Sequence, residues 1–98
     1  MDKYYYTAVI TKVNGIPTLT MPDIPVIKIA GADTVTMVLE AEERLKKYII
    51  KRLKMKKALP SRNTMVIDYI GKEGEEAYDI IVYIPKINEE VKTNEKVN

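Results

Sequence analysis

An Asn-Gly pair at positions 14 and 15 constrains the fold of this chain more than any other feature. Both residues tolerate the positive φ that a two-residue type I′ turn requires, and runs of alternating polarity flank the pair on each side. The pair therefore predicts a β-hairpin. Its register is fixed by the turn, and the predicted cross-strand partners are Val13 with Ile16, Lys12 with Pro17, Ile10 with Leu19, and Ala8 with Met21.

The polarity of the two runs agrees with that register. One face of the hairpin becomes apolar and carries Tyr6, Ala8, Ile10, Leu19 and Met21. The other face is mixed and carries Thr7, Val9, Thr11, Thr18 and Thr20. We expect the first face to form the core and the second to face either water or a partner.

A third strand and a long helix are predicted next. The turn at Pro22, Asp23, Ile24 and Pro25 leads into a short strand over residues 27–30. Asp33 or Thr34 then caps a helix over residues 35–57. The helix carries an apolar stripe that we expect to pack on the sheet, made of Val38, Ala41, Leu45, Tyr48, Ile49 and Leu53.

The remaining chain contains one further predicted strand. Residues 65–70 are apolar and β-branched but too few to assign to a strand or a helical turn. Residues 77–84 predict a strand that is apolar on both faces. Residues 86–98 are polar and predict a flexible tail, so we expect one domain over residues 1–85.

This order of elements predicts an α+β fold. Three strands, a helix and a fourth strand give a mixed sheet of order 3-2-1-4, with the long helix packed on one face. The right-handed crossover rule makes the last strand parallel to the first. The same order places the last strand at an edge of the sheet.

Composition excludes several kinds of chemistry. The chain has no cysteine and no histidine, which removes disulfides, thiolate zinc sites and imidazole bases. No signal peptide is evident, and no apolar stretch approaches the roughly 18 residues that span a bilayer. We therefore expect a cytoplasmic protein without membrane contact.

The predicted order is similar to the front portion of an RNase H-like fold, whose nucleases hold metal ions with acidic residues. One of those residues projects from the first strand, but no acid lies between Tyr4 and Val13 here. Glu40, Glu42 and Glu43 fit the solvated start of the helix. We expect no catalytic residue, no metal site and no cofactor, which disfavours the alternative of a metal-dependent nuclease.

The chain also resembles the HicB-like antitoxin family over roughly residues 3–85. The resemblance lies in four pieces in order: the segment of residues 4–10, YYYTAVI; the segment of residues 21–25, MPDIP; the helix start at Asp33 and Thr34; and the segment of residues 59–61, LPS. The family's N-terminal domain is a partial RNase H fold without nuclease activity. The resemblance implies a non-enzymatic antitoxin that binds and neutralises a small HicA-like ribonuclease toxin.

Three departures from the family pattern are present. Val26 stands where the family usually has glycine, and residues 31–34 form a segment one residue longer than the common form. Many family members also continue into a helix-turn-helix or ribbon-helix-helix domain. Here only the polar tail follows, so we expect no autonomous DNA binding.

The predicted edge strand is the first candidate binding site, because an apolar edge invites pairing with another chain. We expect a toxin or homo-oligomer interface there, and its candidate residues are Tyr78, Ile80, Val82, Ile84, Asp23 and Ile24. Two alternatives stand beside this hypothesis. In the first, residues 65–70 fold back and cover the strand, so that no edge is exposed. In the second, Asp23 only stabilises the turn in which it lies.

The second candidate site is the basic end of the helix. Lys51, Lys54, Lys56 and Lys57 are gathered where cations also favour the helix dipole. They indicate either a solvated helix end or a phosphate contact, and the second reading gives the alternative function of a stand-alone nucleic-acid-binding domain.

Overall fold

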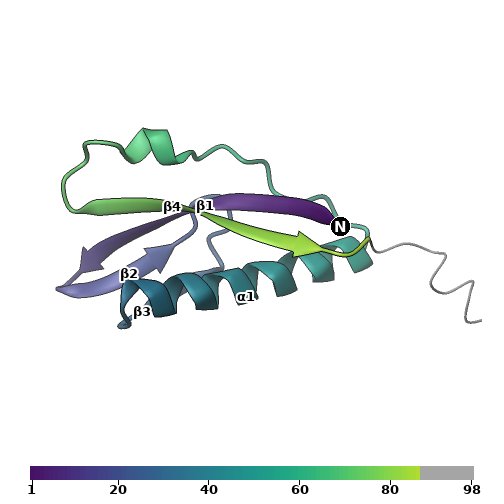
Figure 1. Cartoon of the computed structure of the whole chain (residues 1–98), viewed down its shortest axis with the longest axis horizontal. Coiled ribbons are helices and arrows are strands. Elements are labelled where there is room, and N and C mark those ends of the chain that lie inside the picture. The colour runs from purple at the N-terminus through teal and green to yellow at the C-terminus, as the bar shows by residue number, and fades with distance from the viewer. Residues whose placement is uncertain (87–98) are drawn as a thin grey trace, which may run out of the picture.

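Four strands and one long helix make up the part of the chain that the structure describes, residues 1–86 of a computed structural model. The elements are β1 (Asp2–Val13), β2 (Ile16–Thr20), β3 (Lys28–Ala30), α1 (Thr34–Lys54), the 3₁₀ helix η1 (Val66–Tyr69) and β4 (Glu75–Ile84). The sheet order is β3-β2-β1-β4, and α1 lies along one face (Figure 1). The α+β class, the strand order and the single long helix are confirmed. The predicted tail lies, apart from Lys86, outside the described residues.

The hairpin forms around the predicted turn. Asn14 and Gly15 have φ values of 53° and 79°, as a type I′ turn requires. The observed pairs run from Val13 with Ile16 to Val9 with Thr20, which confirms the register. The predicted partnership of Ala8 with Met21 lies one step beyond this ladder, because β2 ends at Thr20.

Helix α1 buries one stripe against the sheet. Asp33 caps its start by accepting a hydrogen bond of 2.8 Å from the Thr36 amide, which lowers the pKa of the Asp33 carboxyl. The fully buried side chains of the helix are Met37, Ala41, Leu45 and Ile49. Val38, Tyr48 and Leu53 of the predicted stripe are partly buried at its margins, and Met37 is an addition that the prediction missed.

The helix ends three residues before the predicted Lys57. Lys54 is its last residue, and Lys56 adopts a left-handed φ of 56°. The Lys57 amide donates to the Arg52 carbonyl, and the Arg52 side chain donates to the Ala58 carbonyl. The first bond satisfies a carbonyl that a longer helix would have used, and the second fixes the chain just after the helix.

The last strand runs antiparallel to the first, so the prediction of a mixed sheet with parallel first and last strands is wrong. Their pairs run from Asp2 with Ile84 to Thr11 with Glu75. The cause is the segment after α1, residues 55–74, which we call the return segment. It runs back along the sheet on the side away from α1 before β4 begins (Figure 1). β4 therefore starts beside the end of β1 that leads into the hairpin turn. A direct crossover from α1 would have started it beside the opposite end of β1.

The return segment covers the second face of the sheet. The Thr7 hydroxyl donates to the Thr64 carbonyl at 3.0 Å, and the Arg62 guanidinium lies 3.8 Å from the centroid of the Tyr5 ring. Three members of the predicted mixed face are accordingly buried, namely Thr7, Val9 and Thr18. That part of the face is covered by the chain itself rather than by water or a partner.

The segment over residues 65–70, which the sequence left open, contains a helical turn. η1 spans Val66–Tyr69 and begins where the Met65 amide donates to the Asp68 carboxylate at 3.0 Å. η1 contacts β4 but leaves Tyr78, Ile81 and Tyr83 exposed. Folding back of this segment therefore covers β4 only in part.

Truncation of the buried stripe tests the packing of α1. Leu45 is fully buried, whereas Leu39 on the same helix is 59% exposed. We expect Leu45→Ala to lower the free energy of unfolding by about 2–5 kcal/mol, through lost burial and a residual cavity. Leu39→Ala serves as the matched control and should change it by less than about 0.5 kcal/mol. Urea denaturation followed by circular dichroism measures both, and equal losses would contradict this packing.

The buried hydroxyl of Tyr6 should make stability depend on alkaline pH. It donates to the Pro60 carbonyl at 2.7 Å, and burial, followed by the nearby Tyr48 and Asp23, raises its pKa above the ordinary 10.0. Neutral Tyr6 therefore stabilises the fold fully below the pKa of an unfolded tyrosine, and this contribution is lost as the pH rises toward the folded pKa.

We expect Tyr6→Phe to flatten the decline of unfolding free energy above about pH 10. At neutral pH it should cost about 1 kcal/mol for the lost hydrogen bond. Urea titrations across the alkaline range give both quantities. An equally steep decline in the variant would show that Tyr6 is not responsible.

Candidate functional site

β4 is an edge strand with one unpaired side. β1 pairs with it on one side, and within residues 1–86 no strand pairs with the other. Every second side chain of its later half, at Ile80, Val82 and Ile84, is buried in the core. Ile81 and Tyr83 lie on the opposite face and are 38% and 53% exposed. An unpaired edge beside exposed apolar side chains is a surface suited to strand pairing.

The direction of the β4 backbone groups follows from Pro17. The Pro17 carbonyl accepts from the Gly31 amide at 2.9 Å, so the backbone groups of Pro17 face away from β1. The backbone N–H and C=O groups of its partner Lys12 must then point away from β2 and toward β4. The backbone groups of every second residue of β1 point the same way. Pairing between β1 and β4 is continuous. The N–H and C=O groups that point to the unpaired edge are therefore those of Ala77, Asp79, Ile81 and Tyr83.

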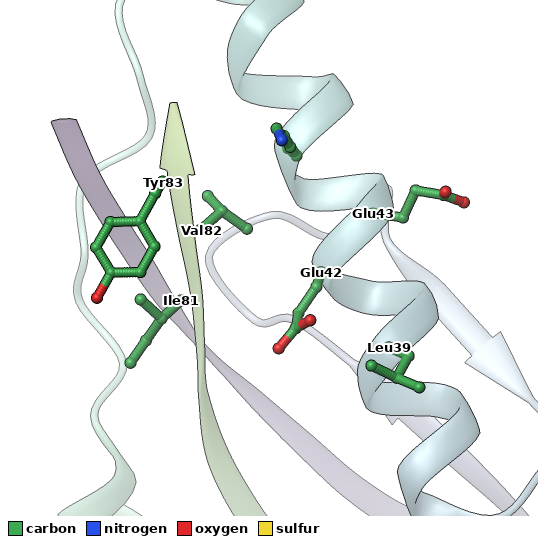
Figure 2. A pocket seen from close by; sticks show the side chains of 7 residues that line it. Leu39, Glu42, Glu43, Ile81, Val82 and Tyr83 are labelled. Atoms are coloured by element: carbon green, nitrogen blue, oxygen red, sulfur yellow. The ribbon is translucent and has the colours of Figure 1, made fainter. Parts of the chain in front are cut away.

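An open groove of about 450 Å³ lies between this strand and α1 (Figure 2). Its walls are Leu39, Glu42, Glu43 and Lys46 from the helix and Ile81, Val82 and Tyr83 from the strand. The helix changes here from acidic to basic side chains. The groove therefore presents both signs of charge and an exposed leucine beside the unpaired edge.

The predicted interface residues divide into core and surface. Ile24, Ile80, Val82 and Ile84 are buried, so their side chains offer little exposed contact area. Tyr78 is 37% exposed, and its hydroxyl donates to the Glu76 carboxylate at 2.8 Å, which raises the pKa of Tyr78. A role of these residues in an interface stays a prediction.

Sequence reasoning missed Ile81 and Tyr83 as interface candidates. Both faces of β4 are apolar, so periodicity alone cannot say which face the helix covers. The free face of this strand therefore became visible only in the structure.

Asp23 fastens the return segment. Its carboxylate accepts hydrogen bonds from the amides of Asn63 and Thr64, both at 2.9 Å, and from the Thr64 hydroxyl at 3.1 Å. The sequence suggested a local turn former, whereas these partners lie about 40 residues further along the chain. Asp23 thus joins the turn before β3 to the cover of the second sheet face.

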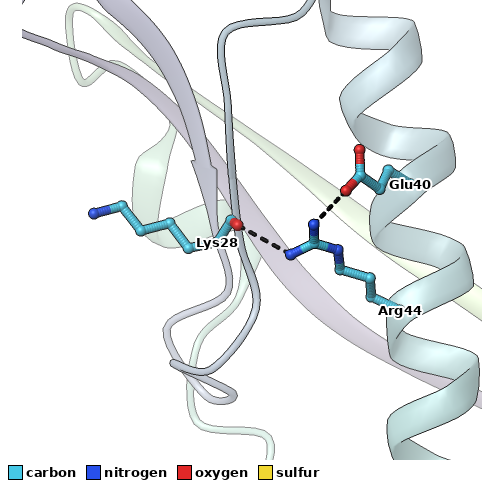
Figure 3. A network of polar contacts seen from close by, with 3 residues as sticks. All are labelled: Lys28, Glu40 and Arg44. Atoms are coloured by element: carbon cyan, nitrogen blue, oxygen red, sulfur yellow. Dashed lines mark hydrogen bonds and ion pairs between the residues drawn. The ribbon is translucent and has the colours of Figure 1, made fainter.

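The acidic side chains of α1 and β4 are not equivalent. Glu40 forms an ion pair with Arg44, and the same guanidinium donates to the Lys28 carbonyl at 3.2 Å (Figure 3). The charge of Glu40 is therefore paired with Arg44, and Arg44 connects α1 to β3. Glu43, Glu76 and Asp79 are exposed, and Asp79 also lies 3.3 Å from the Thr7 hydroxyl.

The basic end of α1 is exposed in the structure. Lys51 and Lys54 lie in the last turns of the helix, and Lys56 and Lys57 follow it. Contact of these side chains with nucleic acid stays a prediction. Over residues 1–86, no three acidic side chains gather where they could hold a metal ion, and no helix is both long and apolar enough to cross a membrane.

Removal of the Asp23 carboxylate tests its role as a fastener. We expect Asp23→Ala to lower the free energy of unfolding by about 1–3 kcal/mol, because two amides and a hydroxyl lose their acceptor. Amide hydrogen exchange at Asn63 and Thr64 should also become faster. Asp23→Asn keeps one acceptor oxygen, so its stability and exchange rates should lie between those of the wild type and of Asp23→Ala. Unchanged amide exchange in Asp23→Ala would contradict the role of Asp23 as a fastener.

Comparison with known proteins identifies a solved structure with the same fold as this chain. No protein-family model matches the chain, and no curated protein matches it. Among solved structures, it is similar to the crystal structure of the N-terminal domain of the Burkholderia pseudomallei antitoxin HicB, with a TM-score of 0.60 and 16% sequence identity. The likeness covers 85% of this chain and 100% of that one. This chain therefore has the fold of the N-terminal domain of an antitoxin.

Proposed function

We propose that this chain is a non-enzymatic, antitoxin-like protein that binds and neutralises a small HicA-like ribonuclease. The observation that carries the proposal is the shared fold, which extends over the whole of the HicB N-terminal domain. The sequence pieces that resemble the family support the same function.

The chemistry of β1 supports a binding role over catalysis. The segment from Tyr4 to Val13 contains no acid, and the chain contains no histidine. A two-metal nuclease needs several carboxylates converging on one site. Within β1 the single acid is Asp2, its first residue, so the strand offers such a site no carboxylate from Tyr4 to Val13.

Charge and exposure support a basic protein as partner. A ribonuclease needs a basic surface for its RNA substrate, and such a surface is complemented by carboxylates. Exposed acids lie near the unpaired edge: Glu43 lines the groove from α1, and Glu76 and Asp79 lie on β4 outside the groove. Tyr78, between the two β4 acids, is the kind of aromatic residue that often anchors interfaces. Binding here would occlude the RNA-binding face of the toxin.

Complex formation tests this function. The chain would be co-expressed with a small basic protein encoded by the neighbouring gene, and the ribonuclease activity of that protein measured with and without the chain. We expect a stable complex and loss of RNA cleavage. We expect Tyr78→Ala to weaken the complex about tenfold or more, as truncation of an interface tyrosine commonly does.

Val26→Ala is the matched control, because Val26 is an exposed aliphatic residue on the turn before β3. It should leave the affinity unchanged. Absence of a complex, or a complex that does not inhibit cleavage, would overturn the proposal. Affinity for RNA or DNA that falls steeply with salt, without any protein partner, would instead favour the lysines at the end of α1.

A further inference from the structure

We propose that the unpaired edge of β4 is a homodimer interface, in which two copies pair antiparallel across a two-fold axis at Ile81. The two sheets then form one continuous sheet, with both copies of α1 on the same face. This inference concerns self-association. With the axis at Ile81, Tyr78 lies opposite the partner's Ile84, so a second copy and a toxin would compete for this edge.

The backbone supplies the pairing groups. Ala77, Asp79, Ile81 and Tyr83 direct their N–H and C=O groups to the free edge. With the axis at Ile81, this residue lies opposite the partner's Ile81, and Asp79 lies opposite the partner's Tyr83. Three such pairs, counting the symmetric one, exchange about six backbone hydrogen bonds.

The charge pattern of β4 selects this register. The strand begins with Glu75 and Glu76 and ends in apolar residues. An axis nearer its start would place these acids against the same acids of the partner, which is unfavourable. An axis at Ile81 instead overlaps the apolar halves and brings Glu76 opposite the partner's Lys86, an attractive pair.

The exposed side chains are buried by the same arrangement. On the face away from α1, Ile81 meets the partner's Ile81, and Tyr83 flanks it on each side. On the α1 side, the two open grooves join, so that each exposed Leu39 lies in a deeper channel. Burial of such side chains is a main source of favourable association energy.

The helix charges argue for a second copy as the occupant. Glu42, Glu43 and Lys46 all line the groove beside Ile81, so the change from acid to base on α1 lies beside the axis. A two-fold axis reverses the second helix and brings Glu43 across from the partner's Lys46. A groove of one sign would repel its own copy, whereas here each Lys46 offers the acids of the other copy an opposite charge.

Proline substitutions test the edge directly. The Ile81 amide points outward, and proline is tolerated where a strand amide faces away from the ladder. We expect the wild-type chain to sediment at twice the 11.2 kDa of one chain. Ile81→Pro should weaken the dimer at least about tenfold while it keeps the circular dichroism spectrum. Val82→Pro, whose amide faces β1, should lower the unfolding temperature instead.

A charge exchange tests the two-fold arrangement. Glu43→Lys should weaken the dimer, and the double variant Glu43→Lys with Lys46→Glu should restore it, because the pairs re-form with reversed sign. A wild-type chain that stays monomeric at submillimolar concentration would overturn the proposal. So would a dimer that neither Ile81→Pro nor Glu43→Lys weakens. Toxin binding enters neither readout, so the two proposals fail separately.

Discussion

Burial of one helical stripe against one face of the sheet is the interaction on which the rest of this structure depends. Met37, Ala41, Leu45 and Ile49 repeat at intervals of four residues and lose all contact with solvent. Because strand side chains alternate between faces, this packing also decides the orientation of β4. Ile80, Val82 and Ile84 turn inward, and the residues between them stay outside.

The second face of the sheet is closed by different means. No second α-helix covers it within residues 1–86; the return segment does so, and its one regular element is the short 3₁₀ helix η1. Polar groups fasten it at defined points, above all the Asp23 carboxylate and the hydroxyls of Tyr6 and Thr7. A cover held by a handful of bonds is expected to open before the helix face does. This path along the sheet is also what makes β4 antiparallel to β1.

These two layers leave part of the sheet uncovered. One edge of the sheet remains unpaired, with exposed apolar side chains on one face and a groove of mixed charge on the other. Under the antitoxin-like function proposed above, a basic protein partner would contact the acids near Tyr78. The proposed dimer centres on Ile81 in the later half of β4, where two-fold symmetry brings Glu76 opposite the partner's Lys86 and the acids of α1 near the partner's Lys46.

The sequence by itself determined the local elements and the sheet order. Asn14 and Gly15 dictated a hairpin and its register, because only a few residues accept positive φ, and Asp33 dictated the helix start by capping it. The apolar stripe was also readable, since helical periodicity is a property of neighbouring residues. The direction of β4, the cover over Thr7 and Val9, and the exposed set at Ile81 and Tyr83 were decided by the tertiary structure. Each depends on the path of residues 55–74, whose long-range contacts with Tyr6, Thr7 and Asp23 leave no periodic signal in the chain.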